Sequence, residues 1–118
     1  MTLTGIAPAP ALAEEALDVN VIPSKPGVTQ VISRILEDPH RDYSRAHGPD
    51  DCDSEETYGS TRDALGQYVA NPEDNKAALR DYILSGKSAC NCTRAIVGKE
   101  IDFLVDDLGM SMSSLPCL

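Results

Sequence analysis

The sequence predicts a mainly all-α fold: a small bundle of about four to five short helices with an extended N-terminal arm and an acidic loop. Apolar residues recur at intervals of three to four positions in several stretches, which is the spacing of one helix face. Two Asx-Pro pairs, Asp38-Pro39 and Asn71-Pro72, have the composition of helix starts. With 118 residues the chain has room for one core, so the helices should pack together as a single domain.

The N-terminal arm is predicted over residues 1–26. It is rich in Pro and Ala, and its short alternation of apolar residues before Pro23 does not define a sheet. An Ala-Leu-Ala run ending at Ala13 imitates a signal-peptidase site, but the arm has neither the basic region nor the apolar helix of a signal peptide. Residues 27–109 are expected to form the helical domain, and residues 110–118 a flexible polar tail.

Four helices are predicted before the last one, over residues 27–37, 39–46, 62–70 and 72–84. The first has a stripe of Val and Ile and must end before Pro39, because the residue preceding a proline is pushed out of the helical region. The second and the fourth begin at a proline that follows an Asx cap. The fourth is expected to bury Ala78, Leu79, Tyr82 and Ile83.

The last helix has the strongest pattern in the chain. Its apolar residues step by four, three and four positions, so it should pack along its whole length. Asn91 or Thr93 is expected to cap its start after a loop over residues 85–91, and Gly109 supplies a typical stop. The stripe consists of Val97, Ile101, Leu104 and Leu108.

A strongly acidic composition limits the classes of partner. The net charge is −9, with 10 Lys and Arg against 19 Asp and Glu. Binding to a phosphate backbone requires clustered cations, so no nucleic acid is expected as a direct partner. No apolar run approaches the ~20 residues of a membrane helix, so no membrane span is predicted. The acids favour either a basic partner surface or a well-solvated face.

An acidic loop is predicted over residues 47–60, where Gly and Pro accompany a dense set of acids. Asp51, Asp53 and Glu55 alternate like the first, third and fifth ligands of an EF-hand calcium loop. The sixth position holds Glu56 in place of Gly, and the twelfth holds Arg62 in place of a bidentate Glu. The sequence therefore predicts no calcium site here.

Four cysteines, at positions 52, 90, 92 and 117, allow two disulfides in three arrangements, or a contribution to a metal site. The Cys-Asn-Cys pair is closer than zinc sites use, and adding His40 and His47 gives no recognised spacing, so no metal is predicted. The expectation is free thiols in the cytoplasm or another reducing compartment. Cys92, near a predicted helix start, is the best candidate for a reactive thiol.

No catalytic constellation stands out in the sequence. We find no Ser-His-Asp arrangement, glycine-rich phosphate loop or dinucleotide fingerprint, so neither an enzyme nor a cofactor is predicted. We expect a non-enzymatic protein-binding module, such as an inhibitor, adaptor or assembly subunit, for a larger protein with a basic or mixed basic and apolar surface. Its contacts are predicted in the loop and at the end of the last helix: Asp50, Asp51, Asp53, Glu55, Glu56, Asp106 and Asp107.

Two alternative functions depend on the cysteines. In the first, the chain is a carrier or precursor protein whose C-terminal tail, containing Cys117, is enzymatically modified. In the second, it is a thiol or metal protein that uses the pair formed by Cys90 and Cys92.

Two stretches resemble known families. Residues 105–110 resemble the segment ahead of the modified serine in acyl carrier proteins, although Ser111 and Met112 stand where that family has Asp and Ser. Residues 68–109, with their Asn-Pro-Glu junction and terminal Leu-Gly, resemble the small helical leader or recognition domains of modified-peptide precursors. Because enzymes alter the short C-terminal tail in those families, this resemblance implies that residues 110–118 are the modified part.

Overall fold

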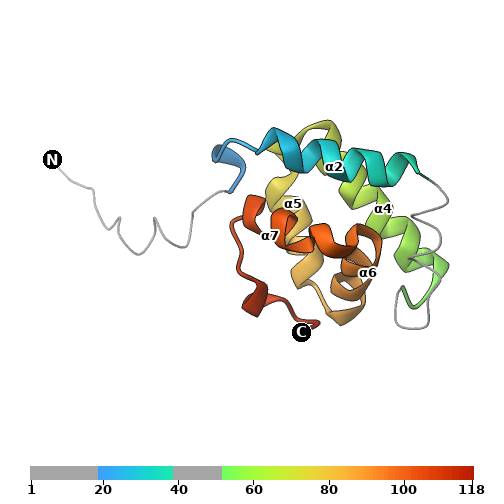
Figure 1. Ribbon diagram of the computed structural model, residues 1–118. Helices are drawn as coiled ribbons and strands as arrows, with labels where there is room; N and C mark the ends of the chain where they lie inside the picture. Colours follow the sequence, from blue (N-terminus) through green and yellow to red (C-terminus); the bar gives the residue numbers. More distant parts are fainter. Residues whose placement is uncertain (1–18, 39–51) are drawn as a thin grey trace, which may run out of the picture.

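The computed structural model describes residues 19–38 and 52–118, which form a small bundle of helices (Figure 1). The predicted all-α fold class is confirmed, and neither described range contains a strand. The described ranges contain five α-helices and three short 3-10 helices. In chain order they are η1 Val19–Val21, α2 Pro26–Glu37, α4 Glu55–Ala70, α5 Pro72–Leu84, α6 Lys87–Val97, η2 Gly98–Glu100, α7 Ile101–Asp107 and η3 Met112–Ser114.

Helix α2 agrees with the first predicted helix. Pro26 opens the first turn, where its missing N–H has no helical partner to lose, and the helix ends before Asp38. One stripe of α2 is fully buried and faces α4. In Figure 1, helix α2 lies at the top of the bundle and crosses α4. The stripe consists of Val28, Ile32 and Ile35. The predicted polar helix over residues 39–46 lies outside the described residues.

Helix α4 begins at Glu55, so the prediction of a loop through residues 55–60 was wrong. The side chain of Ser54 caps the helix, because its Oγ accepts a hydrogen bond from the backbone N–H of Thr57 at 3.1 Å. Glu55 and Glu56 occupy the first turn, where the helix dipole favours negative charge. A serine followed by two acids is typical of a helix start, whereas the dense acidic composition of this stretch favoured the prediction of a loop.

Helix α5 begins at Pro72, as predicted, and packs against α4 as the second arm of a hairpin. Its buried residues are Lys76, Leu79 and Ile83. Ala78 is exposed and Tyr82 is only partly buried, so the predicted inner face was wrong at these two positions. Relative to the prediction, α5 is rotated about its axis, so that Lys76 is part of its buried face.

Helix α6 begins earlier than predicted. It starts at Lys87 after Gly86, so residues 87–91 are helical and not a loop. Asn91 and Thr93, the predicted caps, both lie inside it. The Thr93 hydroxyl donates a hydrogen bond to the carbonyl oxygen of Ala89 at 2.8 Å, within the helix.

The long last helix of the prediction is in fact interrupted. Gly98 has a φ of 60°, a conformation that favours glycine, and the chain passes there through η2 before α7 begins. Val97 and Leu104 nevertheless stay fully buried on either side of the interruption, because the apolar spacing survives it. Gly109, with a φ of 70°, ends α7 as predicted.

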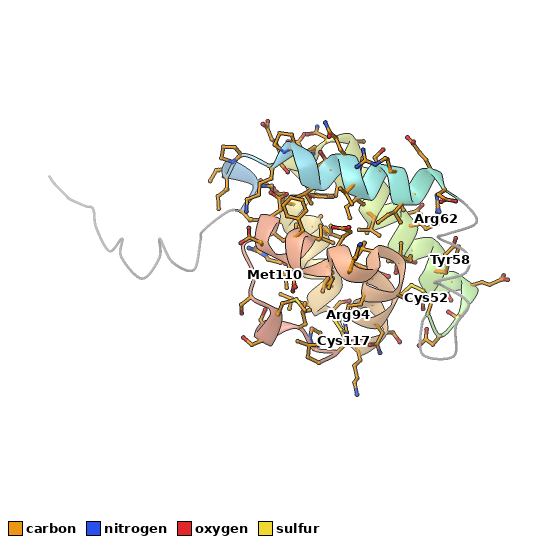
Figure 2. All side chains as sticks on the ribbon, in the orientation of Figure 1. Cys52, Tyr58, Arg62, Arg94, Met110 and Cys117 are labelled. Carbon is orange, nitrogen blue, oxygen red and sulfur yellow. A yellow bond between two sulfur atoms is a disulfide. The ribbon has the colours of Figure 1, made fainter. Side chains whose placement is uncertain are left out.

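Both ends of the described chain pack onto the bundle. Val19 is only 1% exposed, and we call residues 19–25, which lead into α2, the N-terminal strap. At the other end Leu115 is buried, and Arg94 Nη1 donates a hydrogen bond to the carbonyl oxygen of Cys117 at 3.3 Å (Figure 2). The tail that the sequence suggested would be flexible is therefore anchored on α6.

Gly109→Ala is expected to lower the free energy of unfolding by about 1–2 kcal/mol. The variant would hold a side chain at positive φ, and its Cβ would lie 3.1 Å from Cγ2 of Val19. Gly59→Ala is the control: nothing lies within 4 Å of that Cβ in the middle of α4, so we expect a gain of about 0.5–1 kcal/mol. Urea denaturation measures the free energy of unfolding of both variants. Equal values for Gly109→Ala and Gly59→Ala would contradict the prediction.

Candidate functional site

All four cysteines are paired in the structure. Cys52 is bonded to Cys92, with 4.4 Å between the Cα atoms, and Cys90 is bonded to Cys117, with 5.7 Å between them. The expectation of free thiols is therefore wrong for this structure. Cys92, the best candidate for a reactive thiol, is fully buried and has no proton to lose. Both cysteine-dependent alternatives would require a disulfide to open first.

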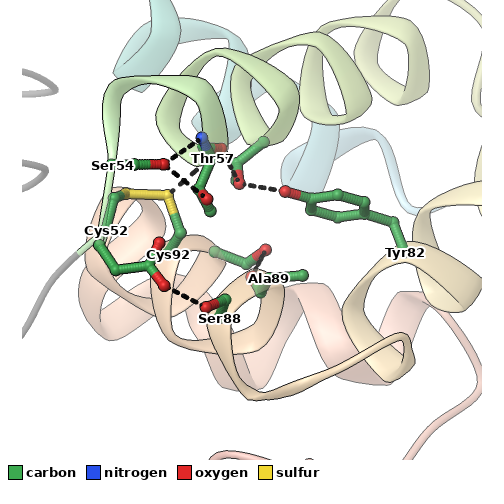
Figure 3. Close-up of a disulfide and its surroundings, with 10 residues drawn as sticks. Cys52, Ser54, Thr57, Tyr82, Ser88, Ala89 and Cys92 are labelled. Atoms are coloured by element: carbon green, nitrogen blue, oxygen red, sulfur yellow. Dashed lines mark hydrogen bonds between the residues drawn. A yellow bond between two sulfur atoms is a disulfide. The ribbon is translucent and has the colours of Figure 1, made fainter.

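The first disulfide fixes the start of α4 against α6 (Figure 3). Beside it, the hydroxyl of Ser88 donates a hydrogen bond to the Asp53 carboxylate. This bond, together with one from Thr57, holds the pKa of Asp53 below its usual value. The chain just before α4 is thus held by one covalent bond and several hydrogen bonds.

Three of the predicted contact residues lie on this fixed segment. Asp53, Glu55 and Glu56 are all exposed, and we call them the acidic end of α4. The structure therefore brings part of the predicted loop cluster together at the start of α4, next to the Cys52–Cys92 disulfide. Asp50 and Asp51, the other two acids of that cluster, lie outside the described residues.

The remaining two predicted acids are far from the acidic end of α4. Figure 1 shows the start of α4 on the right of the bundle and the end of α7 on the left. Asp106 is exposed there and forms an ion pair with Lys25. Asp107 is only 3% exposed, so its predicted exposure was wrong. The predicted acids do not form a single surface.

Asp107 is the centre of a buried polar network. Its carboxylate accepts hydrogen bonds from the Tyr68 hydroxyl at 2.5 Å, the Ser24 hydroxyl at 2.7 Å and the backbone N–H of Lys25 at 2.9 Å. Nζ of Lys76, also fully buried, lies 3.6 Å from the same carboxylate and donates a hydrogen bond to the carbonyl oxygen of Ile22 at 2.6 Å. The network joins α4, α5 and α7 to the N-terminal strap.

The surroundings of Asp107 favour its ionised form. Burial alone would raise the pKa of Asp107, but the hydrogen bonds from Tyr68, Ser24 and Lys25 and the charge of Lys76 outweigh it, so the pKa is below its usual value. Burial, with the neighbouring carboxylate, raises the pKa of Tyr68. The phenol therefore stays protonated and donates to an ionised carboxylate.

An open groove runs along the outer side of the α4–α5 hairpin. One part, of about 360 Å³, lies between the two helices, and a second, of about 290 Å³, continues toward the start of α6. Ser60 and Tyr82 line both parts, so the two parts adjoin each other at these residues. We call it the hairpin groove; its other polar residues are Asp63, Gln67 and Asn75 in the first part and Glu56, Thr57, Ser85 and Ser88 in the second.

Sequence reasoning missed both the buried network and the hairpin groove. Lys76 stands three and seven positions before Leu79 and Ile83, so it is part of an apolar stripe, and Asp107 similarly follows Leu104 by three. Two opposite charges on the apolar faces of different helices were the available signal for a buried pair. The groove has no such signal, because it depends on how closely the two helices pack.

No metal or membrane feature is found in the described ranges. Among these residues no group of three or more His, Cys, Asp or Glu side chains is placed to hold a metal ion. No helix there has the length and apolar character required to cross a membrane. Both histidines, His40 and His47, lie outside the described residues.

Comparison with known proteins gives no relative. The chain matches no family model, and neither a curated protein nor a solved structure is significantly similar to it.

Proposed function

We propose that the protein is a non-enzymatic binding module that presents the acidic end of α4 to a larger protein with a basic surface. The observation that carries this proposal is the exposure of Asp53, Glu55 and Glu56 on a backbone segment that the Cys52–Cys92 disulfide ties to α6. Charged groups on an ordered backbone lose less conformational entropy on binding than charges on a free loop. Their chief effects would be on the rate and the specificity of association.

The disulfides also indicate the kind of compartment in which the protein functions. Paired cysteines persist in oxidising environments and are rare in reducing ones, so we infer an oxidising compartment in place of the reducing one expected from the sequence. Intact mass spectrometry of the protein from its native source measures this. The oxidised chain is about 4 Da lighter than the reduced chain, because each disulfide removes two hydrogen atoms.

Neutralising two acids of α4 is expected to weaken partner binding about tenfold. The variant Glu55→Gln/Glu56→Gln removes two exposed charges and keeps Asp53, whose carboxylate accepts a hydrogen bond from Ser88. Immobilised protein would capture partners from the native source at low salt, and quantitative mass spectrometry would compare the amounts. Binding should also fall as salt rises, because exposed charges are screened.

The matched control is Glu37→Gln/Asp102→Asn, which removes the same charge from exposed positions outside the acidic end of α4. It should change capture less than twofold. Capture that is equal for both variants, or the absence of any partner at low salt, would contradict the proposed function.

A further inference from the structure

We infer that the hairpin groove is the docking site for an extended, arginine- or lysine-bearing segment of the partner protein. This inference rests on the proposed function and deepens it, because it assigns the partner's recognition element and its chemistry. The groove begins at the acidic end of α4, where Glu56 lines it, and continues along the hairpin to Gln67 and Asn75. A segment bound at the acids would therefore extend into it.

Most hydrogen-bond donors of the groove are already used within the fold. The Thr61 hydroxyl donates to the carbonyl oxygen of Thr57 at 2.8 Å, so the 2.6 Å contact between Thr61 and Tyr82 uses the phenol's hydrogen. Ser85 donates to the carbonyl oxygen of Tyr82 at 2.6 Å, and Ser88 donates to Asp53. The groove therefore has few hydrogens left to offer a ligand.

The side-chain amide of Asn75 follows the same pattern. Its Nδ2 donates to the carbonyl oxygens of Gln67 at 3.0 Å and Asn71 at 2.9 Å, which commits both of its hydrogens. What Asn75 has left for a ligand is its carbonyl oxygen. Ser60 and Gln67 can still donate, but the carboxylates of Glu56 and Asp63 and this carbonyl oxygen give the groove an excess of acceptors, which is complementary to a donor-rich ligand.

The charge of the hairpin groove also favours an arginine- or lysine-bearing segment. The lining residues of the two parts include two carboxylates and no Lys or Arg. Three cations adjoin lining residues in the chain: Lys76 is fully buried, Arg62 donates a hydrogen bond to the carbonyl oxygen of Leu36, and Lys87 is exposed. Guanidinium and ammonium groups carry several donors and no acceptor, so they match the groove in both charge and hydrogen bonding.

The length and floor of the groove fit an extended segment. Glu56 and Gln67 are eleven residues apart on α4, which spans about 16 Å at the helical rise. An extended chain covers that distance with about five residues. Ala64 and Ala78 line the groove beside the polar residues, and such short side chains leave space for a backbone to approach closely.

The test uses the full, disulfide-bonded chain and a short unstructured peptide of alternating Arg and Gly-Ser, capped at both ends. Two matched peptides carry citrulline or Glu in place of Arg. Titration followed by amide chemical shifts should show binding of the Arg peptide, with perturbations at Asn75, Tyr82 and Ser88. The citrulline peptide keeps much of the hydrogen bonding without the charge, so we expect it to bind at least about fivefold more weakly.

Two variants alter the groove and leave the acidic end of α4 intact. Asp63→Asn should weaken the Arg peptide about fivefold, and Ala78→Tyr, which fills the groove from an exposed helical position, should weaken it more than about tenfold. The controls Asp102→Asn and Ala70→Tyr make the same changes at exposed positions outside the groove and should have less than a twofold effect.

Several results would overturn the inference. These are no binding of the Arg peptide by the wild-type chain, equal binding of the Arg and citrulline peptides, or equal effects of the groove variants and their controls. Self-association that Ala78→Tyr abolishes would assign the groove to a second copy of the chain instead. If the native partner still binds through Glu55 and Glu56 while the groove variants bind normally, the groove inference fails and the proposed function stands.

Discussion

Removing the Cys52–Cys92 disulfide is expected to lower the free energy of unfolding by about 4 kcal/mol, and removing Cys90–Cys117 by about 3.5 kcal/mol. The two bonds join residues that are 40 and 27 positions apart, and closing a longer loop restricts the unfolded chain more strongly. Since a domain of this size has a total stability of about 5–15 kcal/mol, loss of both bonds should leave it largely unfolded.

Guanidinium denaturation of Cys52→Ala/Cys92→Ala and Cys90→Ala/Cys117→Ala measures the two losses. Alanine suits these sites because Cys90 and Cys92 are fully buried, and serine would add a hydroxyl without a partner there. Adding a thiol reductant to the wild-type chain should lower its midpoint by as much as removing all four cysteines does. A midpoint that does not respond to reductant would contradict the pairing.

Lys76→Met is expected to destabilise the fold by about 3–5 kcal/mol, because it leaves the buried Asp107 carboxylate without its cation. The double variant Lys76→Met/Asp107→Leu replaces both charges by apolar groups and should recover part of this loss. Lys87→Met, at an exposed position, is the control and should change stability by less than about 0.5 kcal/mol. If the two lysine variants were equally stable, the buried pair would have no energetic role.

The Asp107 carboxylate should also make the stability of the fold depend on pH in acid. The pKa of Asp107 is lowered in the folded state, so the unfolded chain takes up its proton first as pH falls. The contribution of Asp107 to the free energy of unfolding is therefore complete above the unfolded pKa of about 3.9, and it is lost as pH falls through the lower pKa of the folded state. Asp107→Asn should be less stable than wild type at neutral pH, and the difference should shrink below pH of about 4, as followed by circular dichroism.

Local sequence patterns were sufficient for α2, for the start of α5 and for much of the core. The spacing of Val28, Ile32 and Ile35 fixes the inner face of α2, and Pro72 marks the start of α5. These features depend on neighbours a few positions away, which the sequence displays directly. Ser54 is a local signal of the same kind, because a serine followed by two acids marks the start of α4.

Features that depend on distant parts of the chain were not predictable in the same way. Four cysteines allow three pairings, and only the packing of α4 and the tail on α6 selects one of them. The burial of Asp107 requires Tyr68, Lys76 and the N-terminal strap at once. The hairpin groove likewise exists only because α4 and α5 pack side by side, which no single stretch of sequence encodes.

The order of the cysteines has a consequence for proteolysis. The two covalent loops, 52–92 and 90–117, overlap at residues 90–92. A single backbone cut anywhere from 52 to 117 therefore releases no fragment, because one of the disulfides always bridges the two sides. Helix α2 lies outside both loops and is held only by non-covalent contacts once the chain is cut between Asp38 and Cys52. Limited digestion can thus detach α2 while the hairpin and the acidic end of α4 remain one covalent unit.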